Sequence, residues 1–129
     1  MRENIELVRR VYAIGLDRTQ PRSLKTALAE LRSLLDPGVV FVPEAGRADG
    51  VAYRGIDQYL ELFERSLEVW ERWSYELSEV VPAGEDRILA VGVVMARRRG
   101  QEVRSPFATV WTLRAGKATR IEPYPDPPA

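Results

Sequence analysis

The chain has 129 residues, carries 19 Lys and Arg against 19 Asp and Glu, and contains neither cysteine nor histidine. The lack of cysteine excludes disulfide bonds and thiolate chemistry, and the lack of histidine removes the commonest general base and the commonest zinc ligand. The balanced charge gives no reason to expect nucleic acid or an anionic membrane as a partner.

The first part of the chain predicts two helices. Apolar residues recur at three- and four-residue spacing over 2–16, and a second apolar stripe of leucines runs from Pro21 to Leu35. The N-terminal segment alternates charged and apolar residues, so it is not expected to be a signal peptide. No apolar run reaches the length of a membrane span. We therefore expect a cytoplasmic protein with one domain over residues 1–129.

The middle of the chain predicts a short buried strand, a polar loop and a third helix. The motif "LDPG" ends the second helix because proline and glycine together cannot continue it, and "VVFV" at 39–42 reads as a strand. The loop "EAGRADG" leads through "VAYRG" to a helix over 56–72. Its apolar face is expected to hold Ile56, Leu60, Phe63, Leu67 and Trp70.

From Trp73 onward the apolar period changes from helical spacing to alternation. This predicts four strands in a meander, separated by the turns "PAGED", "ARRRG" and "AGKA". Three helices with a strand pair between them, followed by four strands, indicate an α+β fold in which the helices cover one face of a curved antiparallel sheet.

This order of elements, together with the motifs between them, resembles the SnoaL-like branch of the nuclear-transport-factor-2-like superfamily. The matching segments are "ENIELVRRVY", "LLDPGVVFVPE", "YRGIDQYLELFERSLEVW", "VPAGEDRILAVGVVMARRRG", "FATVWTLRAGKATRI" and "PYPD". The resemblance implies a cone, a curved sheet wrapped around three helices, with a pocket inside it for a small organic ligand. It also implies a homodimer formed through the outer sheet face.

The superfamily contains ketosteroid isomerases, and their catalytic groups can be compared position by position. The resemblance aligns their oxyanion-binding tyrosine with Tyr12 or Val11, their basic aspartate with Val42, and their second oxyanion group with Ala108 or Thr109. Only the tyrosine has a counterpart in chemical type. Steroid-isomerase chemistry is therefore not expected, and no cofactor or metal is expected.

Glu44 is the one weak candidate for a catalytic residue, because it follows the short strand at the expected mouth of the cone. If apolar neighbours such as Phe41 raise its pKa, it could act as a base. The alternative is a solvated loop carboxylate paired with Arg47, and most loop acids are of this kind.

Other side chains are candidates for lining a ligand pocket. Each tyrosine and tryptophan in this set could instead be an ordinary core residue with its polar atom satisfied. Trp111 could also face outward into a dimer interface, because the two faces of its strand cannot be distinguished. The "ARRRG" turn is expected to be solvated, although Arg97 could point inward and bind an anionic group. The ligand-binding candidates are Tyr12, Phe41, Glu44, Tyr53, Phe63, Trp70, Arg97, Trp111 and Tyr124.

Three functions remain open from the sequence. The first is a protein that binds a small apolar or amphipathic molecule in its cone. The second is an isomerase, cyclase or hydratase that uses Glu44 with Tyr12 or Tyr53. The third is a dimeric interaction module whose cone is filled by side chains, so that only the outer sheet face acts.

Overall fold

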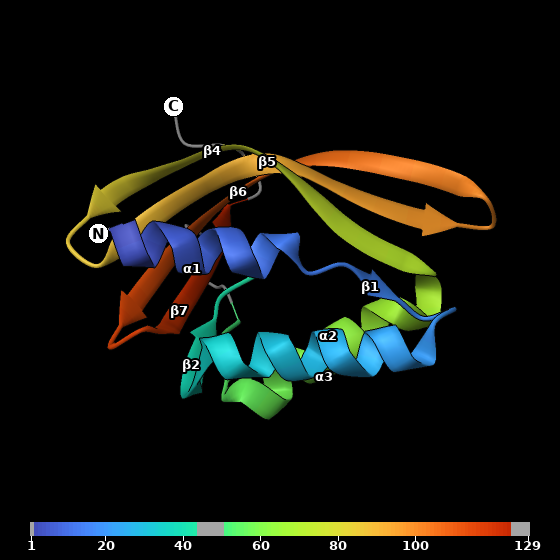
Figure 1. Ribbon diagram of the computed structural model, residues 1–129, viewed down its shortest axis with the longest axis horizontal. Helices are drawn as coiled ribbons and strands as arrows, with labels where there is room; N and C mark the ends of the chain where they lie inside the picture. The colour runs from blue at the N-terminus through green and yellow to red at the C-terminus, as the bar shows by residue number, and fades with distance from the viewer. Residues whose placement is uncertain (1, 44–50, 125–129) are drawn as a thin grey trace.

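A computed structural model describes residues 2–43 and 51–124. Within them the chain forms three helices and a curled sheet of seven strands, which confirms the α+β class (Figure 1). In chain order the elements are α1 (Arg2–Ala13), β1 (Leu16–Asp17), α2 (Pro21–Leu34), β2 (Leu35–Phe41), β3 (Tyr53–Arg54), α3 (Ile56–Val69), β4 (Arg72–Gly84), β5 (Arg87–Arg98), β6 (Gln101–Arg114) and β7 (Lys117–Tyr124).

The sheet has the strand order β1-β4-β5-β6-β7-β2-β3, and β4 to β7 form the expected antiparallel meander. The expectation of a wholly antiparallel sheet is wrong at one edge, because β2 pairs with β7 in parallel. The chain between these two strands contains α3 and the rest of the meander. It is therefore long enough for the crossover that a parallel pair needs.

Two helices are shorter than their apolar spacing predicts. The first ends at Ala13 instead of residue 16, and the third ends at Val69 instead of residue 72. Leu16 pairs with Trp73 and Asp17 with Arg72, so the backbone groups just beyond both helices are bonded in the sheet instead. The two-residue strand β1 closes one edge of the meander in this way.

The second helix ends where the "LDPG" motif predicts, but the strand after it begins at once. The motif is the first half of β2, which therefore starts at Leu35 and not at residue 39. The pairing of β2 with β7 shifts in register between Leu35 and Val40. This irregularity accommodates Pro37, which has no N–H to donate to a ladder.

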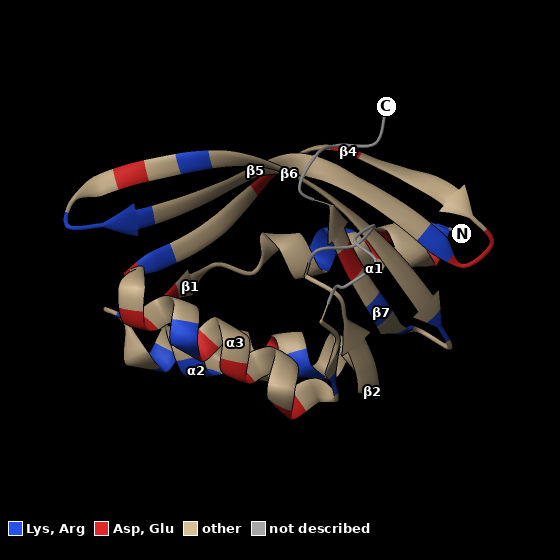
Figure 2. Ribbon diagram, turned by 180° about the vertical axis from the view of Figure 1, so that it is seen from behind, with Lys and Arg blue, Asp and Glu red and all other residues tan. Residues whose placement is uncertain are grey.

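The helices and the sheet enclose one apolar interior. Figure 1 shows α1 directly beneath the bent meander, with α2 and α3 together farther from it. Figure 2 shows positive and negative residues mixed along α2 and α3. The core cluster draws on all three helices and on the inner faces of the strands, including Val8, Leu31, Leu60, Ile88 and Trp111. Within residues 2–43 and 51–124, none of the helices combines the length and apolar character needed to span a bilayer.

β4 and β5 approach each other closely at Gly92. A Cβ atom on this residue would lie 2.2 Å from the carbonyl oxygen of Glu76 and 3.0 Å from the Cα of Leu77. The contact lies beside a bulge in β4 between Leu77 and Glu79. Both contacting atoms belong to the backbone, so only a shift of the strands could make room.

We therefore expect Gly92→Ala to lower the free energy of unfolding by about 3 kcal/mol, as overpacking against rigid neighbours does. Urea denaturation measures this change. Gly15→Ala is the matched control, because a Cβ there meets nothing within 4 Å. Equal stability of the two variants would contradict the close approach.

Candidate functional site

A cavity of about 610 Å³ lies between the concave face of the sheet and the helices. Its lining comes from α1, one face of α3, β2, β3 and the inner faces of β4 to β7, with Leu31 added from α2. The lining is mostly aromatic and aliphatic. In Figure 1, β4 and β5 curve over α1 while α3 lies farther from them.

The structure shows which face of each strand is directed toward the cavity. Phe107, Thr109 and Trp111 of β6 line the cavity, and so does Val94 of β5. Trp111 is 2% exposed. It is therefore a residue of the interior and not of an outer-face interface.

Five aromatic residues form a continuous cluster, which we call the sheet-side wall: Tyr12, Trp73, Tyr75, Phe107 and Trp111. The rings of Tyr12 and Phe107 stack at a centroid distance of 5.1 Å. Tyr75 and Trp111 meet Tyr12 edge-on at 4.9 and 5.6 Å. Tyr75 also meets Phe107 at 5.6 Å and Trp73 at 6.4 Å.

Four other aromatic residues form a second cluster, the helix-side wall: Phe41, Tyr53, Tyr59 and Phe63. Tyr59 is its centre, with Phe41 at 5.0 Å and Phe63 at 5.1 Å. Phe41 continues to Tyr53 at 6.4 Å. In the described part of the chain no aromatic pair joins the two walls, and the cavity touches all members of both.

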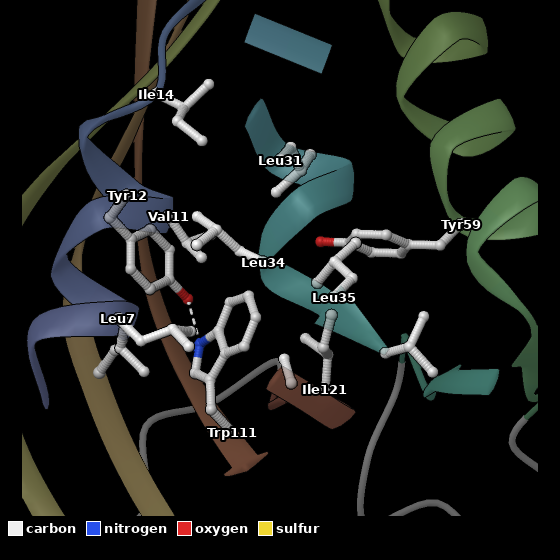
Figure 3. Close-up of a cluster of buried hydrophobic side chains, with 14 of the residues drawn as sticks. Leu7, Val11, Tyr12, Ile14, Leu31, Leu34, Leu35, Tyr59, Trp111 and Ile121 are labelled. Atoms are coloured by element: carbon white, nitrogen blue, oxygen red, sulfur yellow. Dashed lines mark hydrogen bonds between the residues drawn. The ribbon is translucent and has the colours of Figure 1, made fainter. Parts of the chain in front are cut away.

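Two indole N–H groups are satisfied by tyrosine oxygens within the sheet-side wall. Trp73 Nε1 donates to Tyr75 Oη at 2.7 Å, and Trp111 Nε1 donates to Tyr12 Oη at 2.8 Å (Figure 3). The buried Thr109 side chain also hydrogen-bonds Tyr12. Each of these two tyrosine oxygens therefore already accepts a hydrogen bond.

Burial keeps the cavity tyrosines protonated. Desolvation raises the pKa of Tyr75 to about 12, although the Trp73 hydrogen bond partly opposes it. Desolvation also raises the pKa of Tyr12 and of Tyr59 well above the usual value. All three phenols are hydrogen-bond donors at neutral pH, and none can serve there as a base.

These shifts predict a loss of stability in alkali. The folded protein holds protons on Tyr12, Tyr59 and Tyr75 that the unfolded chain releases near pH 10, so stability falls as pH rises from 10 toward 12. Each tyrosine contributes a slope of about 1.4 kcal/mol per pH unit in that window. Urea denaturation at a series of pH values measures the slope. Stability that stays flat above pH 10 while phenolate absorbance rises would contradict it.

The charged side chain of the described lining is Arg65 of α3. Its guanidinium lies 3.1 Å from Glu61 Oε1 and is 68% exposed, so it belongs to the rim. The described lining contains no carboxylate. Glu44, the candidate base, lies outside the described residues, as does Arg47.

Most of the expected pocket residues line the cavity, and two do not. Tyr12, Phe41, Tyr53, Phe63, Trp70 and Trp111 line it. The inward orientation considered for Arg97 is wrong, because Val94 and Ala96 set the inner side of β5 and Arg97 faces Glu102 on the outer side. Tyr124 pairs with Ala108, on the outer side of β6 as well. Figure 2 shows both signs of charge on the projecting β5–β6 hairpin.

Several lining residues were not expected from the sequence. Tyr59 lies three residues after Ile56 and four before Phe63, so helical spacing could have placed it on the inner face of α3. Tyr75 lies two residues after Trp73 in the alternating segment, so strand alternation could have placed both on the same face and added Tyr75 to the site. Thr109, and not Ala108, lines the cavity.

The fold is that of solved NTF2-like proteins. A family model described as "SnoaL-like domain" matches residues 8–121, so the chain belongs to the SnoaL-like family. No curated protein matches the chain.

Solved structures share this fold over nearly the whole chain. An NTF2-like protein from Burkholderia pseudomallei is 20% identical, with a TM-score of 0.74 over 98% of this chain and 92% of the other. TerC, co-crystallized with polyporic acid, is 26% identical, with a TM-score of 0.72 over 96% and 92%. A phenazine biosynthesis-related protein from Pseudomonas aeruginosa is 14% identical, with a TM-score of 0.74 over 95% and 79%.

Proposed function

We propose that the protein binds a small apolar or amphipathic organic molecule in the cavity between the sheet-side and helix-side walls. The observation that carries this proposal is the cavity itself, about 610 Å³ of space lined by aromatic and aliphatic side chains with a few hydroxyls. Ligand pockets in proteins typically hold about 300–1,000 Å³ and have this mixture of lining groups. A cone filled with side chains, as the interaction-module alternative requires, would leave no such volume.

A second line of support comes from TerC, whose structure contains polyporic acid. TerC shares the fold over almost the full length of both chains. Polyporic acid is therefore the first compound to test, beside a panel of aromatic and polyketide-like molecules.

Ligand-induced stabilisation tests the proposal. A compound at about a hundred times its Kd stabilises the folded state by about 2.7 kcal/mol, which raises the Tm. We expect at least one compound of the panel to do so. No rise in Tm across a broad panel would overturn the proposal.

A catalytic role is less well supported than binding. Isomerase, cyclase or hydratase chemistry needs a proton acceptor within hydrogen-bond reach of the substrate. The described lining supplies phenols whose raised pKa makes them donors, together with the Arg65 guanidinium at the rim. The proposal is therefore restricted to binding.

We also propose that two copies pair through the outer face of the sheet. Outward positions of β5 and β6 that keep some exposure form an apolar strip of Leu89, Val91, Val93, Met95 and Pro106. The ion pair between Arg104 and Glu76, 3.2 Å apart, lies at its margin. An apolar centre with charged residues at the margin is typical of a protein interface. Sedimentation velocity should show a dimer, and Val93→Arg should give a monomer. A wild type that stays monomeric at high concentration would contradict the pairing.

A further inference from the structure

A row of four charged residues crosses the outer side of the sheet near the tip of the β5–β6 hairpin. Asp17 of β1 is the partner of Arg72 in β4, and Arg72 is the partner of Arg97 in β5. Arg97 in turn is the partner of Glu102 in β6. Residues directly opposite each other in neighbouring strands share a face of the sheet. The two arginines are therefore adjacent, with a carboxylate at each end of the row.

The arginine pair is only partly compensated by its neighbours. Two like charges directly opposite each other destabilise a sheet. Asp17 Oδ1 accepts hydrogen bonds from the backbone amide and the hydroxyl of Thr19. The pKa of Asp17 is lowered chiefly by the Thr19 hydroxyl, and the charges of Arg72 and Arg97 add to this from a greater distance. Within residues 2–43 and 51–124, neither of these guanidinium groups forms an ion pair or a hydrogen bond.

The same two arginines line a surface depression of about 400 Å³. Ser74 and Glu102 add a hydroxyl and a carboxylate to its lining, which shares no described residue with the interior cavity. Both arginines are exposed, so their N–H groups can reach a ligand from solvent. A guanidinium group offers five N–H donors in a planar fork, which fits the oxygen atoms of an oxyanion. The depression therefore has the chemistry of an anion site.

Glu102 determines which anion the depression can accept. Its carboxylate is 54% exposed, and its Oε1 lies 3.8 Å from Arg104 Nη1. A carboxylate repels an anion that has no proton, but it accepts a hydrogen bond from one that carries a hydroxyl. Inorganic phosphate keeps a P–OH group at neutral pH, whereas sulfate has none. A phosphate monoester loses its last P–OH proton at about pH 6, so it resembles sulfate in this respect.

We propose that Arg72 and Arg97 bind inorganic phosphate on the outer side of the sheet, with Ser74 donating to a phosphate oxygen and Glu102 accepting the phosphate hydroxyl. A phosphate held between the two guanidinium groups removes the cost of placing them side by side. This site is independent of the interior cavity and of the ligand proposed for it.

Titration of the protein followed by backbone amide NMR tests the site, with sodium chloride used to keep the ionic strength constant so that screening does not change. Near pH 7.5 we expect phosphate to shift the amide signals of Ser74, Arg97 and Gly100 in a saturable manner. Sulfate and methyl phosphate should bind about tenfold more weakly, because neither donates a hydrogen bond to Glu102 at this pH.

Four substitutions of exposed side chains, which should leave the fold intact, assign the roles. Arg72→Gln and Arg97→Gln each remove one guanidinium group, and each should weaken phosphate binding at least about tenfold. Arg98→Gln is the matched control, because it removes the same charge from a neighbouring residue that does not line the depression. Glu102→Gln removes the repulsion and adds an amide donor, so sulfate should then bind about as tightly as phosphate.

The contrary outcomes are distinct. Equal weakening by Arg98→Gln and Arg97→Gln would show a diffuse charge effect and overturn the site. Shifts that are spread over many basic residues and do not saturate would overturn it as well. Equal affinity of the wild type for phosphate, sulfate and methyl phosphate would overturn the role of Glu102 and the choice of inorganic phosphate. None of these results bears on ligand binding in the interior cavity, which is tested separately.

Discussion

Trp111→Ala is expected to lower the free energy of unfolding by about 4 kcal/mol, within the range found for large aromatic residues removed from cores. The indole is 2% exposed and packs edge-on against Tyr12 at 5.6 Å. Its Nε1 also donates to Tyr12 Oη at 2.8 Å, so the substitution removes both the packing and a buried hydrogen bond. Urea denaturation measures the loss.

Two further variants separate these contributions. Trp111→Phe keeps an aromatic ring but removes the N–H, and it should cost about 1–2 kcal/mol, as the loss of one buried hydrogen bond does. Trp70→Ala is the matched control for size, because Trp70 is only half-buried at the end of α3. It should cost clearly less than Trp111→Ala. Equal losses at positions 70 and 111 would contradict the central place of Trp111 in the sheet-side wall.

Ser66→Trp is expected to abolish ligand uptake with little change in stability. Ser66 is half-buried on the face of α3 that lines the cavity, and its hydroxyl bonds only the carbonyl of Leu62 one turn earlier. An indole at this position would occupy space that the ligand needs. We expect the Kd of any compound that stabilises the wild type to rise at least about a hundredfold, because the indole side chain and the compound cannot occupy the cavity together. Titration calorimetry measures it.

Glu64→Trp is the control for this substitution. Glu64 is exposed on the same helix and does not line the cavity, so the same change in residue should leave the Kd unaltered. Loss of binding in both variants would indicate that a tryptophan on α3 disturbs the helix itself. The loss in Ser66→Trp would then not support the cavity as the binding site. Unchanged binding in Ser66→Trp would place the ligand elsewhere.

The three helices were predictable because each has a clear apolar stripe. The residues at which they begin agree closely with those expected from the sequence. The ends of the first and third helices were not predictable, since Leu16 and Arg72 leave helical geometry for a long-range pairing of β1 with β4. A two-residue strand has no pattern of its own. The parallel pairing of β2 with β7 is long-range in the same sense, and local sequence contains no signal for it.

The inner faces of the strands could not be predicted because β5 and β6 are apolar on both sides. Val93 and Met95 on the outer side of β5 are as hydrophobic as Val94 and Ala96 on the inner side. Alternation therefore could not assign Arg97 or Trp111 to a face, and the expectation for Arg97 was wrong. The curvature of the whole sheet, a tertiary property, decides which side becomes the interior (Figure 1).

The candidate site was predicted in part. Six aromatic candidates line the cavity, since apolar spacing and the family resemblance both indicate inner positions. Tyr59 and Tyr75 were overlooked as site residues although their spacing was favourable. The division of the rings into two walls depends on tertiary geometry, because Tyr12 and Tyr59 lie on different helices whose relative placement local sequence does not encode.

A crystal structure of the complex with the compound that gives the largest rise in Tm is the most direct test of ligand binding in the cavity. We expect the compound to be ordered between the sheet-side and helix-side walls, in contact with Tyr12 and Tyr59. A compound bound on the outer face of the sheet, with the cavity holding only solvent, would contradict it.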